Sequence, residues 1–152
     1  MKYIIVVLAF MAMSCNDKVE DAHAHNADGS HLGEEIPRLD HTIWTDKTEL
    51  FVEFPALIVG NGIKFAAHFT ALYKHQPVQN GSVTVSLIKD GKGIRNTVDT
   101  HSSPGIFSPV IQPKEAGTYQ LVFELTTPEY SDKITIDNVT VYANADEAIK
   151  AL

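Results

Sequence analysis

The stretch KEAGTYQLVFEL, residues 114–125, places a glycine and a tyrosine just before a run of alternating apolar residues. Tyr119, Leu121, Phe123 and Leu125 fall on one face of an extended chain, because successive side chains of a strand point to opposite sides. Gly117 is suited to turning the chain ahead of this strand. The pattern predicts a tyrosine corner, in which the Tyr119 hydroxyl returns to the upstream backbone.

The segments around this strand also have the composition of strands. Residues 48–54, 63–72 and 82–98 alternate apolar and polar side chains, and KDGKG at 89–93 is a hairpin signal. Residues 106–111 form a short strand with Pro109, which we expect at a sheet edge, and KITIDNVTVYA at 133–143 completes the set. About seven strands at spacings of about ten residues predict an all-β fold, an immunoglobulin-like antiparallel β-sandwich over residues 41–143.

The chain has 152 residues and a net charge of −7. Residues 16–40 carry seven acids and two bases, whereas residues 41–152 carry twelve acids and nine bases. An acidic chain lacks the basic face that nucleic acid or an anionic lipid surface would require, so we expect no nucleic acid partner.

The first residues, MKYIIVVLAFMAMSCN, have the form of an export signal. Lys2 precedes an apolar run from Tyr3 to Met13, which is too short to span a bilayer as a helix. The run ends in small residues at Cys15, the one cysteine of the chain. We therefore predict a lipoprotein signal peptide over residues 1–14 and lipidation of Cys15, which would anchor the protein to a membrane. The alternative is a cysteine that lies by chance near an ordinary cleavage site.

Residues 15–40 are expected to form a flexible acidic segment, called the tether below, because they offer almost nothing apolar to bury. Within it, the stretch EDAHAHNADGSH at 20–31 places three histidines in nine residues. Imidazole and carboxylate suit Zn²⁺, Cu²⁺, Co²⁺ or Ni²⁺, so a weakly bound divalent transition metal is one interpretation and a solvated spacer is the other. The candidate metal ligands are His23, His25, His31, Asp21 and Asp28. No cofactor is predicted to be obligatory.

Histidines of the sandwich form a second candidate set of metal ligands. His68 lies in the middle of a predicted strand, on the face opposite Phe65 and Phe69, and is expected on the surface. His41, His75 and His101 fall in predicted loops and could meet His68 at one end of the sandwich. We therefore keep His41, His68 and His101 as a secondary metal set.

The sequence contains no motif that is typical of a catalytic site. Asp99, His101 and Ser102 lie close together in DTHSSPG, but a triad requires a spatial arrangement of the three side chains, and no G-x-S-x-G motif accompanies them. A turn at Ser103, Pro104 and Gly105 explains this stretch better. The protein is predicted not to be an enzyme.

The last residues, 144–152, predict a short helix. Asn144 and Glu147 have the spacing of a capping box, and helix-forming residues follow. About two turns are unstable unless they dock, so the segment is either a helical tail that packs on the sandwich or a truncated linker.

The domain also resembles a known family. The blocks TDKTELFVEFPALIVG, FAAHFT, GSVTVSLI and SSPGIFSP, within a similarity that runs from His41 to Ala148, are similar to the N-terminal domain of periplasmic adaptor proteins. These adaptors are the membrane-fusion subunits of resistance-nodulation-division heavy-metal efflux pumps. In that family a lipidated cysteine and a His-rich acidic segment commonly precede the domain, as Cys15 and residues 20–31 do here. The family's lipoyl, helical-hairpin and barrel domains do not follow.

The resemblance implies a non-enzymatic lipoprotein of a Gram-negative cell envelope, anchored in the periplasm. Its expected role is to bind or present divalent metal, and its expected partners are efflux-pump components or the remaining adaptor domains. The alternative is a structural protein-interaction sandwich without a metal role.

Overall fold

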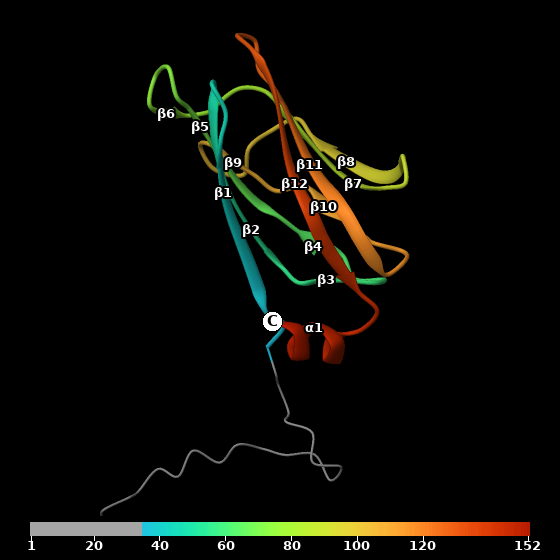
Figure 1. Cartoon of the computed structure of the whole chain (residues 1–152). Coiled ribbons are helices and arrows are strands. Elements are labelled where there is room, and N and C mark those ends of the chain that lie inside the picture. The colour runs from blue at the N-terminus through green and yellow to red at the C-terminus, as the bar shows by residue number, and fades with distance from the viewer. Residues whose placement is uncertain (1–34) are drawn as a thin grey trace, which may run out of the picture. The chain divides into compact units, whose positions relative to one another are not determined.

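Residues 35–152, the part of the chain that the computed structural model describes, form two facing β-sheets and one short helix (Figure 1). The elements in chain order are β1 (Arg38–Trp44), β2 (Thr48–Pro55), β3 (Leu57–Ile58), β4 (Ile63–Lys64), β5 (Ala66–Ala71), β6 (Gln76–Pro77), β7 (Ser82–Lys89), β8 (Lys92–Val98), β9 (Ile106–Phe107), β10 (Val110–Ile111), β11 (Gly117–Thr126), β12 (Ser131–Tyr142) and α1 (Ala145–Ala151). The predicted all-β sandwich with a short C-terminal helix is confirmed.

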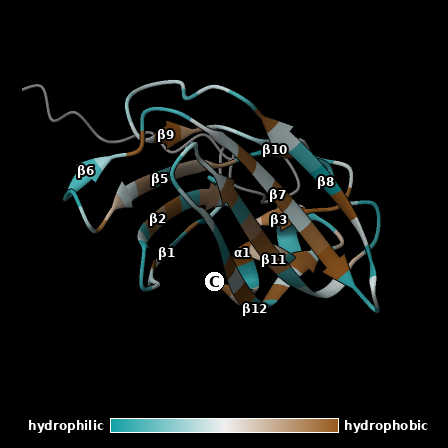
Figure 2. Ribbon diagram, turned by 90° about the horizontal axis from the view of Figure 1, so that it is seen from above, coloured by the Kyte–Doolittle hydropathy of each residue, from teal (hydrophilic) through white to brown (hydrophobic). Residues whose placement is uncertain are grey.

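The sheets have the strand order of an immunoglobulin-like sandwich. One sheet runs β1-β2-β5-β6 with β9 also paired to β5, and the other runs β3-β12-β11-β7-β8. All pairings in the two sheets are antiparallel except that of β3 with β12, which is parallel. The strands β4 and β10 form a separate antiparallel pair. Seen from above, the sheets form two layers (Figure 2).

The core lies between the layers because the strands alternate as their sequences predict. Leu50, Val52 and Phe54 of β2 are fully buried, as are Leu121 and Phe123 of β11. Aromatic rings connect the layers: Phe65 lies 5.1 Å from Phe54 and 5.6 Å from Phe123 between ring centroids. With no disulfide among the described residues, burial of these side chains supplies most of the stabilisation.

The predicted tyrosine corner is present at the start of β11. The Tyr119 hydroxyl donates a hydrogen bond of 2.9 Å to the carbonyl oxygen of Glu115. Gly117 has a φ of 138° and is the first residue of β11. The predicted hairpin is present too: Asp90 and Gly91, both with positive φ, join β7 to β8. Such a pair of positive φ values matches the twist of the flanking strands.

The first strand begins earlier than the predicted boundary at His41. β1 starts at Arg38, so the last residues assigned to the tether belong to the sandwich. Leu39 and Ile43 pack against the core on alternate positions of β1. The acidic composition of residues 16–40 conceals this short alternation in the sequence.

The predicted strand at 106–111 divides into two. β9 pairs with β5 at the edge of one sheet, and β10 pairs with β4. Pro109 lies between them and its carbonyl accepts a hydrogen bond from the Phe65 amide. Because proline has no N–H to donate to a ladder, the chain leaves the first sheet at this position.

The C-terminal helix α1 packs on the sandwich. The Asn144 side chain accepts a hydrogen bond of 2.9 Å from the Glu147 amide, and the Glu147 carboxylate accepts one of 3.2 Å from the Ala143 amide. Ala148 is fully buried against Ala56 and Ile58, and Ile36 packs on the same cluster. The start of the described chain and its C-terminal helix therefore lie at one end of the sandwich (Figure 1).

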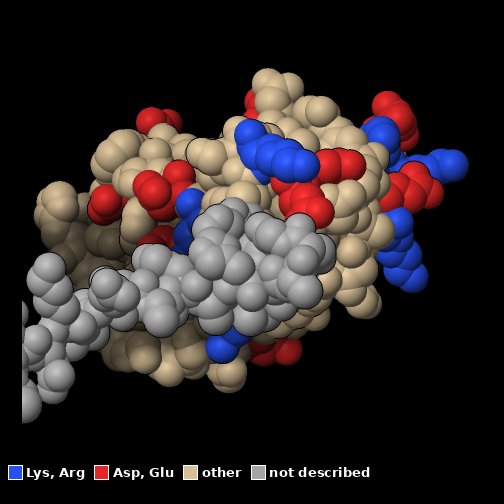
Figure 3. Space-filling model, turned by 90° about the horizontal axis from the view of Figure 1, so that it is seen from below, with Lys and Arg blue, Asp and Glu red and all other residues tan. Residues whose placement is uncertain are grey.

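The surface of that end carries both signs of charge. Figure 3, which views it from below, shows acidic and basic side chains interspersed. In residues 35–152, no helix is long and apolar enough to cross a membrane.

Candidate functional site

A polar pocket of about 270 Å³ lies at the end of the sandwich away from α1. It is called the loop-end pocket here. It lies between the segment that joins β5 to β7 and the loop that joins β11 to β12. Its lining residues are Ala71, Tyr73, Lys74, Gln76, Pro77, Val78, Gln79, Asn80, Thr127, Pro128, Glu129 and Tyr130.

A threonine shapes the loop between β11 and β12. The Thr127 hydroxyl oxygen accepts hydrogen bonds from the amides of Glu129 (3.2 Å) and Tyr130 (2.9 Å). The Thr127 amide in turn donates to the Tyr130 carbonyl over 2.9 Å. These bonds close a four-residue loop in the way that Ser and Thr side chains favour. The loop therefore holds the Glu129 carboxylate over the pocket.

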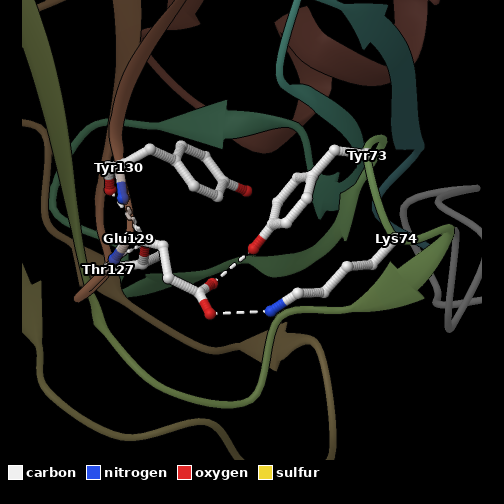
Figure 4. Close-up of polar contacts among 5 residues, drawn as sticks. All are labelled: Tyr73, Lys74, Thr127, Glu129 and Tyr130. Atoms are coloured by element: carbon white, nitrogen blue, oxygen red, sulfur yellow. Dashed lines mark hydrogen bonds and ion pairs between the residues drawn. The ribbon is translucent and has the colours of Figure 1, made fainter.

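The opposite wall is a turn after β5. The Leu72 amide donates to the Lys47 carbonyl over 2.9 Å, which ties this turn to the hairpin between β1 and β2. Tyr73 and Lys74 follow, and Tyr73 is 56% exposed. Figure 4 shows both side chains directed toward Glu129.

One carboxylate joins the two walls. The Tyr73 hydroxyl donates to one oxygen of Glu129, and the Lys74 ammonium lies 2.6 Å from the other. The Tyr73 and Tyr130 rings are perpendicular, with centroids 5.9 Å apart. Thr48 donates to the Tyr130 hydroxyl over 3.2 Å. Side chains from two loops and from the first residue of β2 thus meet at this end of the sandwich.

The ion pair sets the charge state of the pocket. The hydrogen bond from Lys74, followed by that from Tyr73, lowers the pKa of Glu129. The same bond to Glu129 raises the pKa of Lys74 to about 12. Burial is the main reason that the pKa of Tyr130 is raised. All three shifts move away from neutrality, so none of these groups is suited to exchange protons near pH 7 as an acid–base catalyst would.

The sandwich histidines do not gather into a metal site. His41, predicted in a loop, lies in β1 and stacks on Phe54 with centroids 5.9 Å apart. In the register, His41 faces Val52, a core residue, whereas His68 of β5 faces Phe51. Residues directly opposite each other on paired strands have their side chains on the same face of the sheet, whereas consecutive residues of one strand have theirs on opposite faces. His41 and His68 therefore lie on opposite faces of the sheet and cannot bind one cation.

His101 contacts an aromatic ring of the core. It follows β8 and lies against Phe107, with ring centroids 6.2 Å apart. Among residues 35–152, no group of three His, Cys, Asp or Glu side chains is placed to hold a metal ion. The structure therefore does not bring His41, His68 and His101 together as one set of ligands.

The turn at 102–106 agrees with its prediction. The Ser102 hydroxyl donates to the Ile106 carbonyl over 3.0 Å, and the Ile106 amide donates to the Ser103 carbonyl over 2.7 Å. Gly105 has a φ of 81°. The Ser102 hydroxyl closes the turn, and its bond to a carbonyl oxygen does not activate it as a nucleophile would require.

The remaining predicted site residues lie outside the described residues. They are Cys15, Asp21, His23, His25, Asp28 and His31. Their predicted roles stay predictions.

The sequence patterns above do not predict the loop-end pocket. One sequence signal could have pointed to it. In two places a threonine precedes another hydroxyl-bearing residue by three positions: Thr45 before Thr48, and Thr127 before Tyr130. The Thr45 oxygen accepts from the Thr48 amide over 2.9 Å, as Thr127 does from Tyr130. Such spacing identifies two ordered loops, but their proximity depends on the sheet pairing.

Comparison with known proteins identifies no family for this chain: neither a scan against protein-family models nor a search of curated proteins finds a match.

Proposed function

We propose that this protein is a non-enzymatic, lipid-anchored periplasmic domain related to the adaptor subunits of resistance-nodulation-division heavy-metal efflux pumps. In this proposal the tether captures a divalent transition metal ion and the sandwich contacts pump components or other adaptor domains. The observation that carries it is the cluster of three histidines and several acids at residues 20–31, between the Cys15 signal and the sandwich.

The donor set supports the metal part of the proposal. Neutral imidazole with carboxylate is suited to Zn²⁺, Cu²⁺, Co²⁺ and Ni²⁺, which would be cargo. Binding must order the segment that holds the ion, which lowers affinity and favours exchange. Weak, exchangeable binding is what a protein that passes an ion to a transporter requires.

The sandwich histidines provide a matched control for the metal experiment. Titration calorimetry with Zn²⁺ and with Cu²⁺ would compare the full chain, a variant with His23→Ala, His25→Ala and His31→Ala, and a variant with His41→Ala and His68→Ala. We expect the first variant to lose at least about tenfold in affinity, which is the effect of removing even one ligand or its support. The second should bind as the unmodified chain does, because its two histidines lie on opposite faces of one sheet. Equal heats for all three proteins would show that the tether does not bind the metal.

The anchor is tested separately. Mass spectrometry of the protein isolated from membranes should find Cys15 as the N-terminal residue with attached acyl chains. An unmodified Cys15 in the native material would contradict the lipoprotein part of the proposal.

The second candidate function is a structural interaction module without a metal role. The loop-end pocket favours it, because tyrosines held among ordered loops are typical of contact surfaces. Deletion of residues 20–31 would then leave the metal tolerance of the cells unchanged. Under the first proposal the same deletion lowers that tolerance.

A further inference from the structure

We propose that the loop-end pocket binds a neutral saccharide, with one pyranose ring of an oligosaccharide occupying the hollow between Tyr73 and the 127–130 loop. This inference does not depend on the tether or on metal. It rests on the aromatic residues, the amides and the charge of the pocket.

Tyr73 and Tyr130 contribute aromatic surface to the pocket, and the Lys74 ammonium lies over the Tyr73 ring, 4.9 Å from its centroid. Tyr73 is one of the few large apolar side chains of residues 35–152 that are mostly exposed, and it lines the pocket with Tyr130. A pyranose ring presents C–H groups on its faces, and the electron-rich face of an aromatic ring attracts their partial positive charge. The glutamate bond and the perpendicular contact with Tyr130 hold the Tyr73 ring in place.

Uncharged hydrogen-bonding groups surround that surface. Gln76, Gln79 and Asn80 are exposed and line the pocket. Within residues 35–152, none of their side-chain amides forms a hydrogen bond with another residue of this range. A side-chain amide offers both donors and an acceptor, which matches paired hydroxyls or an acetamido group on a sugar.

The charges of the pocket favour a neutral ligand. Lys74 and Glu129 neutralise each other at 2.6 Å, and the shifted pKa values keep both groups ionised at neutral pH. A charged ligand would have to compete with this pair, whereas hydroxyl groups can share its remaining hydrogen-bonding positions. The pocket volume of about 270 Å³ lies just below the range of about 300–1,000 Å³ typical of drug-sized ligands. One sugar ring therefore suits it better than a large ligand.

The walls are preorganised. The segment that carries Gln76 and Pro77 lies close to the 102–106 turn: a Cβ built at Gly105 would lie only 2.7 Å from Cβ of Pro77. Val78 is buried and its amide donates to the Phe69 carbonyl over 2.9 Å. A rigid site avoids the entropic cost of ordering loops upon binding.

The test is a titration of the full chain with three neutral trisaccharides in the presence of a chelator. The probes are the β-1,4-linked N-acetylglucosamine trimer, cellotriose and maltotriose. We expect at least one of them to bind with a Kd of about 1 mM or tighter. Amide chemical-shift changes in NMR spectra should concentrate in residues 73–80 and 127–130.

Three variants make the result specific. Tyr73→Ala should weaken binding about threefold to tenfold, as expected for the loss of one aromatic contact. Tyr73→Phe keeps the ring and should bind more tightly than Tyr73→Ala. Trp44→Ala is the matched control, because Trp44 is 62% exposed but does not line the pocket, and it should bind as the unmodified chain does.

Several outcomes would overturn the proposal. The first is that none of the three sugars binds at concentrations of about ten times the expected Kd. The second is that Tyr73→Ala binds the sugar as tightly as the unmodified chain does. The third is that the amide chemical-shift changes lie outside the pocket. Capture of a protein by a photo-cross-linker at Tyr73, together with failure of the sugars, would identify the pocket as a protein contact. Each of these results leaves the metal experiment on the tether unaffected, so the two proposals fail independently.

Discussion

The Tyr119 side chain stabilises the turn that leads into β11. Its hydroxyl reaches back over four residues to the Glu115 carbonyl, and the Lys89 ammonium lies 5.5 Å from the centre of its ring. Gly117 leaves room for this arrangement, because a Cβ there would lie 2.6 Å from the Lys89 nitrogen. The residues of the corner are close neighbours in the chain, which is why the sequence pattern alone predicts it.

Replacing this hydroxyl tests the tyrosine corner. Tyr119→Phe should lower the free energy of unfolding by about 0.5–1.5 kcal/mol, the net contribution of one hydrogen bond. Tyr142→Phe is the control, since the Tyr142 hydroxyl forms no hydrogen bond within residues 35–152. Urea denaturation measures both. Equal unfolding midpoints for the two variants would show that the corner contributes nothing to stability.

Gly81 is required by a close backbone approach. Its φ is 143°, and a Cβ there would lie 2.3 Å from the Thr126 carbonyl oxygen. Gly81→Ala should destabilise the protein by about 2–4 kcal/mol, because backbone strain and a clash with backbone add together. Gly91→Ala, also at positive φ but with no atom within 4 Å, should cost only about 1–2 kcal/mol. Similar losses of stability in thermal denaturation would contradict the steric argument.

At the scale of elements, three loops depend on one another. The hairpin between β1 and β2 contacts the turn after β5 through Lys47 and Leu72, and contacts the 127–130 loop through Thr48 and Tyr130. Thr45 also donates to the Asp132 carboxylate of β12. Each loop is ordered by its own threonine or turn, but the pocket exists because the sheet pairing brings the loops together.

The Lys74–Glu129 pair predicts a pH dependence. Because the folded pKa of Glu129 lies below its ordinary value of 4.5, its stabilising effect is full above pH 4.5 and is lost as the pH falls through the folded pKa. Lys74, with a pKa of about 12, stays charged throughout that range. Glu129→Gln should therefore lose less stability between neutral pH and acid than the unmodified protein does.

The measurement is chemical denaturation at neutral pH and below pH 4.5, in low and high salt. Both side chains of the pair are about half exposed, at 46% and 56%, so added salt should reduce the difference between the two proteins. An identical pH profile for Glu129→Gln would show that the pair does not stabilise the loops.

We expect helix α1 to unfold independently of the core of the sandwich. Asn144→Ala removes its N-cap, which is worth about 0.5–2 kcal/mol to a helix. Hydrogen exchange should accelerate at the amides of Ala148 and Leu152, whose bonds lie within the helix, and should not change at Phe123. Equal acceleration at Phe123 would mean that the helix unfolds only with the core.

For the whole molecule, the aromatic contacts between the sheets carry the greatest weight. Phe65→Ala should lower the free energy of unfolding by about 3–5 kcal/mol, since this fully buried ring contacts Phe54 and Phe123. That is a large part of the roughly 5–15 kcal/mol that domains typically have. Phe51→Ala, on the half-buried outer face against His68, is the control and should cost much less. Equal losses of unfolding free energy for the two variants in urea denaturation would show that the Phe65 ring contributes no more to the core than Phe51 does.

Much of the fold is predictable from the sequence, and the pocket is not. Alternation identifies the buried faces of β2, β5 and β11, and the turn signal at Asp90 and Gly91 identifies a hairpin. These features depend on residues close together in the chain. β1 escapes prediction because its alternation, RLDHTIW, is short and adjoins an acidic segment. His41 is therefore expected in a loop, and its stacking on Phe54 is not foreseen.

The sequence alone determined the strand-rich architecture, the tyrosine corner and the capped helix, because a side-chain period, a turn residue or a cap acts over a few neighbouring positions. The tertiary structure alone decided which distant groups meet. Tyr73 and Glu129 are 56 residues apart and form one network, whereas His41 and His68 are nearer in sequence and lie on opposite faces of a sheet. The reason is physical: which strands pair, and in which register, follows from burying the whole core at once, and no local pattern contains that information.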